Sequence, residues 1–428
     1  MSHESRLKRR LRILHVSPSY APMIGGAERL LQSVSERLAE RGHQVTVLTF
    51  DCATQRDFWS AKPAGLPHRE TLNGVQVIRV ATAPGRLHRM YEWWLGRRGG
   101  WRTAGWLVGM DDWALLGPSG INMLPSIAGL RADVVTSVNW CMAATYWAIL
   151  PRGLRRAPRV GVPILHIECD WAANPHYLRM LEGCDASIVC TDAEREFVEA
   201  RGGRSVVVAG AGADPARFAH RDGARIRARH GIGDRPVIGF VGRQDKLKGT
   251  ATLIEAMRIV WREVPDAVLL MAGPSAHRDA VVSDALAGLS DCDRSKIVLI
   301  DDFADVDGPS IMDACDVLAL PSVEESFGMV FVEAWMCGKP VIGGDIASTR
   351  CVIDHGVDGW TATPFDAEDL ACKIMDLLAD PAKRACFGER GRAKALARYT
   401  WDRVTDAWET ALINVAAGAS ARRVSPAR

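Results

Sequence analysis

Residues 321–345, PSVEESFGMVFVEAWMCGKPVIGGD, decide the fold. Apolar residues recur in this stretch at helical spacing, which predicts an amphipathic helix packed against a sheet. They are Phe327, Val330, Phe331, Ala334 and Trp335. Ser326 precedes the helix as its expected N-cap, and the Cys-Gly-Lys-Pro run at 337–340 ends it with glycine and proline. The stretch therefore predicts a strand end, a loop, one helix and a second strand.

Two carboxylates bracket the start of this helix. Glu325 stands before it and Glu333 lies in its second turn. A helix N-terminus favours phosphate, because its first N–H groups are unpaired and carry partial positive charge. The two glutamates are suited instead to accept hydrogen bonds from hydroxyl groups, which a sugar and a ribose both carry. The stretch predicts a site for a sugar joined to a nucleotide diphosphate. The alternative is a capping acid and an acid on a solvated helix face.

The composition limits the class of protein. The chain has 428 residues, 48% of them hydrophobic and 24% charged, which fits a soluble protein of two or three domains. A formal net charge of +2 gives no support for nucleic-acid binding. The 11 cysteines form no C-x2-C pair and lie mostly in apolar runs, which favours reduced thiols and a cytoplasmic location. No apolar run approaches the roughly 20 residues of a membrane span.

Strands and helices alternate along the chain in two series, which predicts two doubly wound α/β domains with mostly parallel sheets. Ligands of such sheets bind beyond the carboxyl ends of the strands, so we expect the site in the cleft between the halves. The expected domains are 1–214 and 236–400, with a linker at 215–235, a last helix at 401–416 and a disordered tail at 417–428. The expected strands are 12–17, 44–50, 74–81, 133–138, 160–167, 186–191, 205–209, 237–241, 267–272, 296–300, 316–320 and 340–343.

Residues 84–125 interrupt this alternation with a segment rich in tryptophan and arginine. These two side chains favour surfaces that are partly apolar and partly wet, such as a membrane interface, a sugar or a partner protein. Residues 86–113 are therefore a candidate for acceptor recognition and for peripheral contact with a membrane. The alternative is a long insertion whose aromatic side chains simply pack on the domain.

Two glycine-bearing loops follow predicted strands. Gly25 and Gly26 lie between the first strand and a helix at 28–41, where the backbone must approach a ligand or another segment closely. In the second half, Arg243 and Lys248 flank a turn directly after the strand at 237–241, and these cations suit a diphosphate. The alternatives are a plain tight turn for the glycines and a solvated basic turn for the cations.

Two further clusters of residues suggest a metal site and a nicotinamide-binding loop, and both interpretations have weaker support. His166, Glu168 and Asp170 would share one strand face, which permits a metal site, but no second cluster completes a coordination shell. We expect His166 to hydrogen-bond a substrate instead. The run VVAGAGA at 207–213 contains Gly-x-Gly after a strand, but a proline at 215 and a missing next strand argue against a nicotinamide dehydrogenase.

Taken together, these residues resemble the family 4 retaining glycosyltransferases, which have the GT-B fold. The similar positions are the Pro22…Gly25-Gly26-x-Glu28 loop, His166, the Gly242-Arg243…Lys248-Gly249 turn and the run from Glu325 through Cys337-Gly338-Lys339-Pro340. The resemblance implies two facing Rossmann-like domains, with the last helix crossing back to the first. It also implies transfer of a hexosyl group from a nucleotide-diphosphate sugar to a hydroxyl acceptor, which is a glycan, a lipid-linked compound or a small molecule.

The resemblance also implies a role for each site residue. Glu333 would accept from the ribose hydroxyls, Glu325 would hold a hydroxyl of the hexose, and His166 would contact the donor sugar near the reacting carbon. The remaining donor contacts would come from Gly25, Gly26, Arg243, Lys248, Ser326, Phe327, Gly328, Met329 and Val330. No metal and no other cofactor is expected. The alternatives are a phosphorylase of the same fold and a non-catalytic protein that binds sugar nucleotides.

One departure from the family's pattern precedes the linker. The family usually has a Pro-Asn-Gly-Val-Asp turn there, whereas this chain has Gly-Ala-Gly-Ala-Asp at 210–214. The asparagine is lost, and the contacts that it would make are lost with it.

Overall fold

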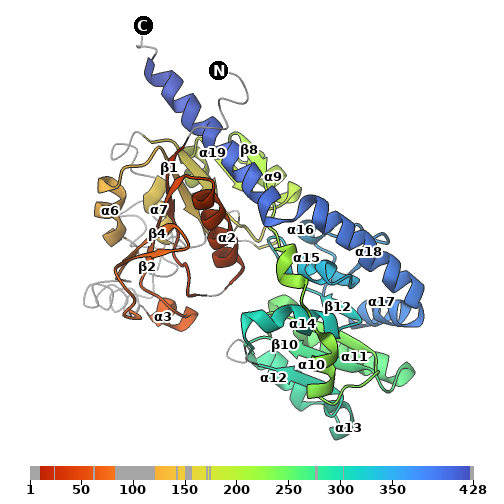
Figure 1. The fold of residues 1–428 in the computed structure, drawn as a ribbon. Coiled ribbons are helices and arrows are strands. Elements are labelled where there is room, and N and C mark those ends of the chain that lie inside the picture. Colours follow the sequence, from red (N-terminus) through yellow and green to blue (C-terminus); the bar gives the residue numbers. More distant parts are fainter. Residues whose placement is uncertain are drawn as a thin grey trace. The chain divides into compact units, whose positions relative to one another are not determined.

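The computed structural model describes residues 10–23, 25–60, 63–81, 121–140, 143–149, 157–169, 172, 175–274, 278–301 and 303–424 (Figure 1). The chain divides into two compact units. Unit 1 holds residues up to Leu165, Cys169–Gly210 and the chain from Asp402 onward, and unit 2 holds His166–Glu168 and Ala211–Trp401. Both units are α/β and each contains one largely parallel sheet, so the predicted fold class is confirmed. Among the described residues, no helix is both long and apolar enough to cross a membrane.

The sheet of unit 1 runs in the order β3-β4-β2-β1-β5-β6-β7-β8. All its neighbours are parallel except β3 and β4. β3 was not predicted, because its alternating exposed and half-buried residues form no apolar run. The strands are β1 (Arg12–Val16), β2 (Gln44–Phe50), β3 (Arg69–Leu72), β4 (Val75–Val80), β5 (Val134–Val138), β6 (Arg159–Val162), β7 (Ala186–Val189) and β8 (Val206–Val208). The helices are α2 (Gly26–Glu40), α3 (Gln55–Ser60), η1 (Ile121–Met123), α6 (Leu124–Gly129), α7 (Ala143–Ile149), α8 (Pro175–Gly183), α9 (Asp192–Glu199) and α19 (Trp401–Val424).

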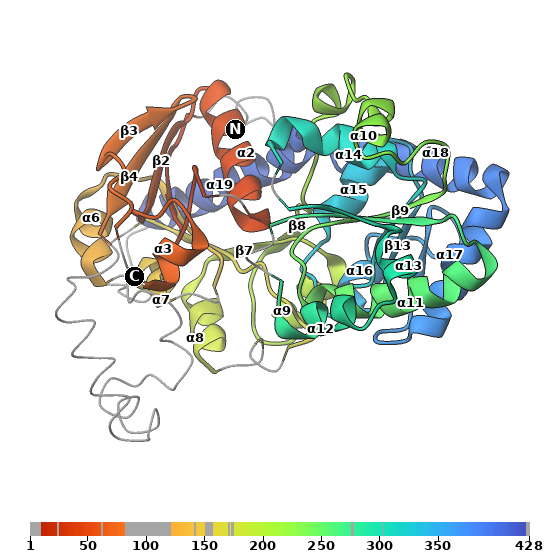
Figure 2. The ribbon, with the colours of Figure 1, turned by 90° about the horizontal axis from the view of Figure 1, so that it is seen from below.

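The last helix, α19, packs against α2 within unit 1, and the two helices lie side by side in Figures 1 and 2. Arg41 of α2 reaches two acids of α19, with Nη1 2.9 Å from Asp406 Oδ1 and 2.7 Å from Glu409 Oε2. Nε2 of the buried His43 lies 2.8 Å from Glu409 Oε1. Because α19 continues to Val424, residues 417–424 are helical where the sequence predicted a disordered tail.

A buried histidine lies beneath α19. Nδ1 of His15, in β1, lies 2.6 Å from Thr136 Oγ1 of β5, and its ring stands edge-on to Trp408 with the centroids 6.0 Å apart. Burial lowers the pKa of His15 to about 3. An unfolded histidine titrates near pH 6.5, so below that pH the unfolded chain binds a proton that the folded chain does not. The free energy of unfolding therefore falls as the pH drops from 6.5 toward 3.

The slope from this one group is about 1.4 kcal/mol per pH unit. We expect urea unfolding to show the wild-type protein losing about 2 kcal/mol more than His15→Asn between pH 7 and pH 5. The slope of unfolding free energy against pH is compared between the two proteins, so the contributions of the other titrating groups cancel. The comparison holds even if the variant is less stable at every pH. Equal slopes for the two proteins would mean that His15 accepts its proton in the folded state.

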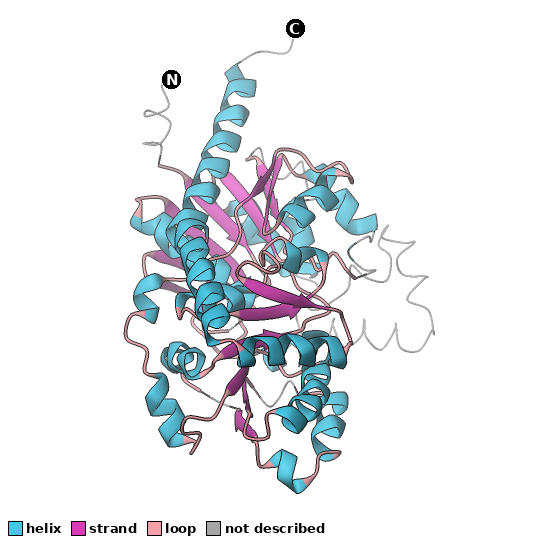
Figure 3. Ribbon diagram, turned by 90° about the vertical axis from the view of Figure 1, so that its right-hand side faces the viewer, coloured by secondary structure: helices cyan, strands magenta, loops and turns pink. Residues whose placement is uncertain are grey.

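The sheet of unit 2 is parallel and runs in the order β11-β10-β9-β12-β13-β14. Helices cover both of its faces, with α10, α14, α15 and α18 on one side and α11, α12 and α17 on the other (Figure 2). Figure 3 shows the strands in magenta with helices in cyan around them. Its strands are β9 (Val237–Val241), β10 (Val268–Ala272), β11 (Ile297–Ile300), β12 (Val317–Leu320), β13 (Val341–Gly344) and β14 (Gly359–Ala362). The helices are η3 (Pro215–Phe218), α10 (Gly223–Arg229), η4 (Lys246–Lys248), α11 (Thr250–Glu263), α12 (Ala280–Ala287), α13 (Asp291–Arg294), η6 (Asp305–Asp307), α14 (Gly308–Ala314), α15 (Met329–Met336), α16 (Ala347–Arg350), α17 (Ala367–Ala379) and α18 (Pro381–Arg398).

The segment expected as a linker is folded into unit 2. Residues 215–235 form η3 and α10, and Ile226 and Ile232 are buried in the core of that unit. The Asp313 carboxylate accepts from Arg221 Nε at 3.0 Å and from the Gly223 N–H at 3.0 Å. The polar and basic composition that suggested a linker instead supplies ion pairs to the surface of this unit.

The strand expected at 160–167 ends early. β6 stops at Val162, because Pro163 follows it and has no N–H to continue the ladder. His166 and Glu168 therefore lie in a loop and turn, not on one strand face, and Asp170 falls outside the described residues. The tryptophan- and arginine-rich segment is outside them as well, from residue 82 to residue 120, together with the contact surface predicted at 86–113.

Candidate functional site

The predicted residues gather where the strand order of each sheet reverses. In unit 2 the reversal lies between β9 and β12, and the loops that follow these strands carry Arg243, Lys248 and Glu325. In unit 1 it lies between β1 and β5, and the loop after β1 carries Gly25. Such switch points are where open α/β sheets bind ligands, because two neighbouring loops diverge there and leave room. The expected binding position of each unit therefore lies beside these four residues, whereas His166 follows β6 and Glu333 lies within α15.

The two loops of unit 2 are tied together by their backbones. Val323 N–H donates to Leu247 O at 2.9 Å. Gly249 adopts a left-handed φ of +68°, and a Cβ at this position would lie 2.1 Å from Pro321 O. No other residue fits both the dihedral angle and the contact. The close packing between the two loops therefore requires the glycine at position 249.

An ion pair joins the same two loops through side chains. Lys248 Nζ lies 2.5 Å from Glu325 Oε2, and only 13% and 12% of the two side chains are exposed. Burial by itself would raise the pKa of Glu325, but the charge and hydrogen bond of Lys248, with His166 and Arg243 nearby, lower it below its usual value. Glu325 is therefore held as a carboxylate acceptor. Sequence reasoning assigned Lys248 and Glu325 separate partners, whereas the structure pairs them.

The loop after β9 is shaped by aspartates that accept from its backbone. Asp245 Oδ1 accepts from Lys248 N–H at 3.0 Å, and Asp279 Oδ2 accepts from Lys246 N–H at 2.8 Å. Arg243 Nη1 lies 3.3 Å from Asp245 Oδ2, and 40% of the Arg243 side chain is exposed. Of the two predicted cations, Arg243 is thus the one that reaches solvent and is open to an incoming anion.

The helix after Glu325 begins later than predicted. α15 starts at Met329, and its N-cap is Gly328 with φ +83°, so the prediction that Ser326 caps the helix is wrong. The reason is that Phe327 turns inward ahead of the helix: it is buried and stands edge-on to Tyr399, with ring centroids 5.3 Å apart. Glycine has no side chain to cap a first turn. Phe331 N–H donates to Gly328 O at 3.0 Å, so the N–H groups of Met329 and Val330 are the ones at the start of α15 that could meet another acceptor.

Glu333 lies in α15 beside an arginine that the sequence did not single out. Arg217 Nη1 is 3.7 Å from Glu333 Oε1, with 26% and 16% of the side chains exposed. Arg217 comes from η3, which begins with Asp214 as its cap and Pro215 in its first turn. An aspartate followed by proline is a helix-start signal. That signal could have revealed the turn and brought Arg217 into consideration.

A second group missed by the sequence ties together the ends of β9, β10 and β11. Gln244 is fully buried and donates from Nε2 to Gly273 O at 3.2 Å. Its Oε1 accepts from Arg278 Nε at 2.8 Å, and Arg278 Nη2 lies 2.6 Å from Asp301 Oδ1. Nothing in the local sequence marks these three residues, because the contacts join positions 34 and 23 residues apart.

In unit 1 the glycine loop opens α2. Gly26 is the first residue of the helix and Gly25 is its N-cap, in extended conformation. A Cβ on Gly25 would lie 2.2 Å from Glu28 Oε2, so the glycine lets the buried Glu28 carboxylate approach the backbone. Ser19 donates to the other oxygen of Glu28. These contacts fix the shape of the loop after β1.

His166 lies in the loop after β6 and groups with unit 2. Its Nδ1 is 3.6 Å from Glu324 Oε2, which precedes Glu325 in the chain. Upstream, Ile164 has φ +54°, an unusual value for a β-branched residue. The buried Glu194 carboxylate accepts from Leu165 N–H at 2.8 Å and from Cys190 N–H at 2.7 Å, and so holds this bend. The positioning of His166 thus depends on a long-range contact.

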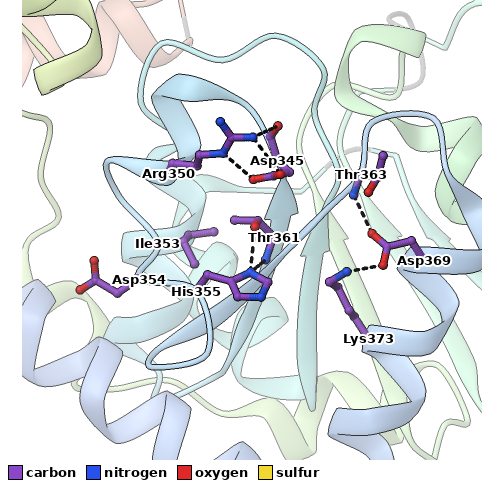
Figure 4. Close-up of a pocket in the computed structure, with 9 residues that line it drawn as sticks. All are labelled: Asp345, Arg350, Ile353, Asp354, His355, Thr361, Thr363, Asp369 and Lys373. Carbon is purple, nitrogen blue, oxygen red and sulfur yellow. Dashed lines mark hydrogen bonds and ion pairs between the residues drawn. The ribbon is translucent and has the colours of Figure 1, made fainter.

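Unit 2 also has a cavity of about 560 Å³ at the carboxyl ends of β13 and β14 (Figure 4). No predicted site residue lines it. Its charged groups largely compensate one another: Arg350 Nε lies 2.7 Å from Asp345 Oδ1 and lowers the pKa of that aspartate, and Lys373 pairs with Asp369. His355 Nδ1 accepts from Thr361 N–H at 3.1 Å. The paired charges give this cavity no clear preference for a diphosphate.

Comparisons with known proteins show what the sequence is similar to. Residues 222–394 match the family described as Glycosyl transferases group 1. The chain is 26% identical to a D-inositol 3-phosphate glycosyltransferase of Segniliparus rotundus, covering 92% of this chain and 86% of the relative. It is 28% identical to the enzyme of that name from Mycobacterium bovis, covering 92% and 80%.

Solved structures share the fold over nearly the whole chain. Alr3699/HepE of Anabaena, in complex with UDP and glucose, has a TM-score of 0.69 at 20% identity and covers 95% of this chain and 100% of that one. Sucrose-phosphate synthase of Thermosynechococcus elongatus has a TM-score of 0.71 at 20% identity, covering 96% and 100%. From the sequence matches and the shared fold, we conclude that the chain is a glycosyltransferase with the GT-B fold that resembles the family 4 enzymes.

Proposed function

We propose that this glycosyltransferase moves a hexosyl group from a nucleotide-diphosphate sugar to a hydroxyl acceptor, with retention of the anomeric configuration. The observation that carries the proposal is the buried pair of Lys248 and Glu325 at the switch point of unit 2. It offers a fixed carboxylate acceptor for a sugar hydroxyl beside cations suited to phosphate. The complexes of Alr3699/HepE with UDP and with UDP-glucose support a donor of this class.

In this proposal each group has one task. Glu325 accepts from a hydroxyl of the hexose, and Glu333 accepts from the ribose hydroxyls. Arg243, Lys248 and the N–H groups at the start of α15 stabilise the diphosphate as it takes up negative charge. His166 and the Gly25-Gly26 loop supply the remaining donor contacts. No metal is required, because the cations and N–H dipoles are already fixed in position.

The bond changes follow from this charge distribution. The bond between the anomeric carbon and the diphosphate oxygen breaks, and its electron pair stays on the phosphate. The acceptor oxygen forms its bond to the same carbon on the same face, and its proton passes to the leaving phosphate oxygen. The relatives named for D-inositol 3-phosphate support a small hydroxyl-bearing compound as one class of acceptor. Proton NMR of the product tests retention, since an inverted anomeric centre would contradict this part of the proposal.

The donor class is tested by incubating the protein with UDP-, GDP- and ADP-hexoses and a panel of hydroxyl acceptors that includes D-inositol 3-phosphate, and by measuring release of the nucleoside diphosphate. We expect one donor series to be consumed without added inorganic phosphate. Consumption of a sugar phosphate, with inorganic phosphate as the second product and no need for a nucleotide, would favour a phosphorylase instead. Turnover of neither class would leave only nucleotide binding and would overturn the assignment of a transferase.

Glu333→Ala should weaken nucleotide binding more than it lowers turnover. The carboxylate would contact the ribose equally in the ground state and the transition state, so its removal raises KM with kcat little changed. We expect an increase in KM of roughly tenfold to a hundredfold, about 1.4 to 3 kcal/mol of binding free energy. Steady-state kinetics with the donor identified above measures both constants. A variant that keeps the wild-type KM would remove Glu333 from the site.

A further inference from the structure

Arg217 is anchored on the side facing away from Glu333. Its Nη2 donates to Asp305 O at 2.6 Å and lies 2.8 Å from Asp305 Oδ1. Two oxygens of one residue therefore fix one end of the guanidinium, and its planar shape directs Nη1 toward Glu333. The three residues come from η3, η6 and α15 of the same unit.

The distance between Arg217 and Glu333 has a chemical consequence. At 3.7 Å, Nη1 and Glu333 Oε1 attract each other as charges but are too far apart for a direct hydrogen bond. Arg217 therefore attracts the carboxylate without a direct hydrogen bond between Nη1 and Oε1. By contrast, Lys248 lies within hydrogen-bond distance of Glu325.

We propose that Arg217 is a positioning residue that orients the Glu333 carboxylate toward the ribose hydroxyls of the donor. The inference rests on the proposed function, because it needs Glu333 to contact the ribose. Arg217 acts through Glu333, so its effect requires the ribose hydroxyls to be present. The sequence gives no hint of this role, since Arg217 lies 116 positions before Glu333 in a segment expected to be a linker.

Arg225 provides a matched control for Arg217. It is also an arginine from the segment at 215–235, and its Nη2 lies 2.6 Å from Asp307 Oδ1 in the same η6 turn. Within the described part of the chain, Arg225 forms its ion pair with Asp307 and not with Glu333. Arg225→Gln therefore removes an arginine–aspartate pair of the same type, from the same two segments, and leaves Glu333 with its neighbour.

The test measures binding of UDP, GDP and ADP, and of their 2′,3′-dideoxy counterparts, by titration calorimetry. For the wild-type protein we expect the best ribonucleotide to bind more tightly than its dideoxy counterpart. Arg217→Gln should weaken the ribonucleotide on the order of tenfold and leave the dideoxy nucleotide unchanged, so that the preference for ribose is lost. Arg225→Gln should keep the wild-type preference. In kinetics, Arg217→Gln should raise KM with kcat little changed.

The other possible outcomes would contradict the role of Arg217, the contact of Glu333 with ribose or the proposed function. If Arg217→Gln weakens the two forms of the nucleotide equally, or keeps the ribose preference, Arg217 has no positioning role and the proposed function stands. If the wild-type protein binds a nucleotide without preferring ribose, the contact of Glu333 with ribose is wrong, and this inference falls with it. If no nucleotide binds to the wild-type protein, the proposed function itself fails.

Discussion

Glu325→Gln should lower kcat by about 10² to 10³, the effect of removing one fixed electrostatic contact from an active site. The amide keeps the shape of the side chain but removes the charge that Lys248 faces at 2.5 Å. A largely buried lysine is then left without its carboxylate partner, and the hexose loses an acceptor of fixed orientation. Because the contact would strengthen as charge develops in the reaction, turnover should suffer more than donor binding.

The pair should behave as one unit in kinetics. Lys248→Met is expected to cost about as much as Glu325→Gln, and the double variant little more than either single variant, because each substitution already breaks the pair. Steady-state assays of the three variants with the donor series form the cycle. Glu255→Gln is the control, since Glu255 is half-exposed and, within the described part of the chain, forms its ion pair with Arg258 of the same helix. Wild-type turnover in Glu325→Gln, or full additivity in the cycle, would contradict the role given to the pair.

Trp335→Ala should destabilise unit 2 by about 3 to 5 kcal/mol, as expected for truncating a fully buried tryptophan. Trp335 lies in α15, is 0% exposed, and donates from Nε1 to Asp358 O at 3.0 Å. Lys394 of α18 lies over its ring, 4.7 Å from the centroid, and also donates to Val352 O at 2.7 Å. The ring thus joins α15, α18 and the loop before β14, and its loss leaves a cavity among all three.

Trp335→Phe is the matched variant, because it keeps an aromatic ring and loses mainly the Nε1 donor. We expect it to cost clearly less than the alanine variant. Urea unfolding gives the size of the change, and hydrogen–deuterium exchange of peptides from each unit shows where it occurs. Faster exchange limited to unit 2 agrees with the packing described above. An unfolding midpoint close to wild type for Trp335→Ala would show that α15 does not depend on this side chain.

The sequence predicted the two loops of the candidate site in unit 2, because the residues that indicate these loops lie close together in the chain. The loops after β9 and β12 follow short buried apolar runs and carry their glycines and charges within a few residues, so Arg243, Lys248 and Glu325 were identified together. The pairing of Lys248 with Glu325 could not be predicted, because it joins positions 77 residues apart through the sheet. The end of α15 was predicted correctly from its glycine, and its start was misplaced because Phe327 fits the helical period while packing on Tyr399.

Other parts of the site depend on contacts that have no local signature. His166 was assigned to a strand, but Pro163 ends that strand and Glu194 holds the bend that follows. Arg217 was missed because residues 215–235 are rich in arginine and glycine and were interpreted as a linker. The aspartates that pair with these arginines lie in η6 and α14, far away in the chain. β14 was missed because Gly359–Ala362 is short and pairs only with β13. In each case the deciding partner is far away in the chain.

We propose that the donor binds at the switch point of unit 2 through Glu325 and Glu333. Titration calorimetry of the consumed nucleotide sugar against wild-type protein, Glu333→Ala and His355→Ala tests this binding mode. His355 lines the cavity of about 560 Å³ at the ends of β13 and β14 of the same sheet, so its variant tests a second position in the described part of this unit. We predict that Glu333→Ala weakens binding at least tenfold and that His355→Ala binds as wild type. Loss of binding in His355→Ala with wild-type affinity in Glu333→Ala would contradict the account.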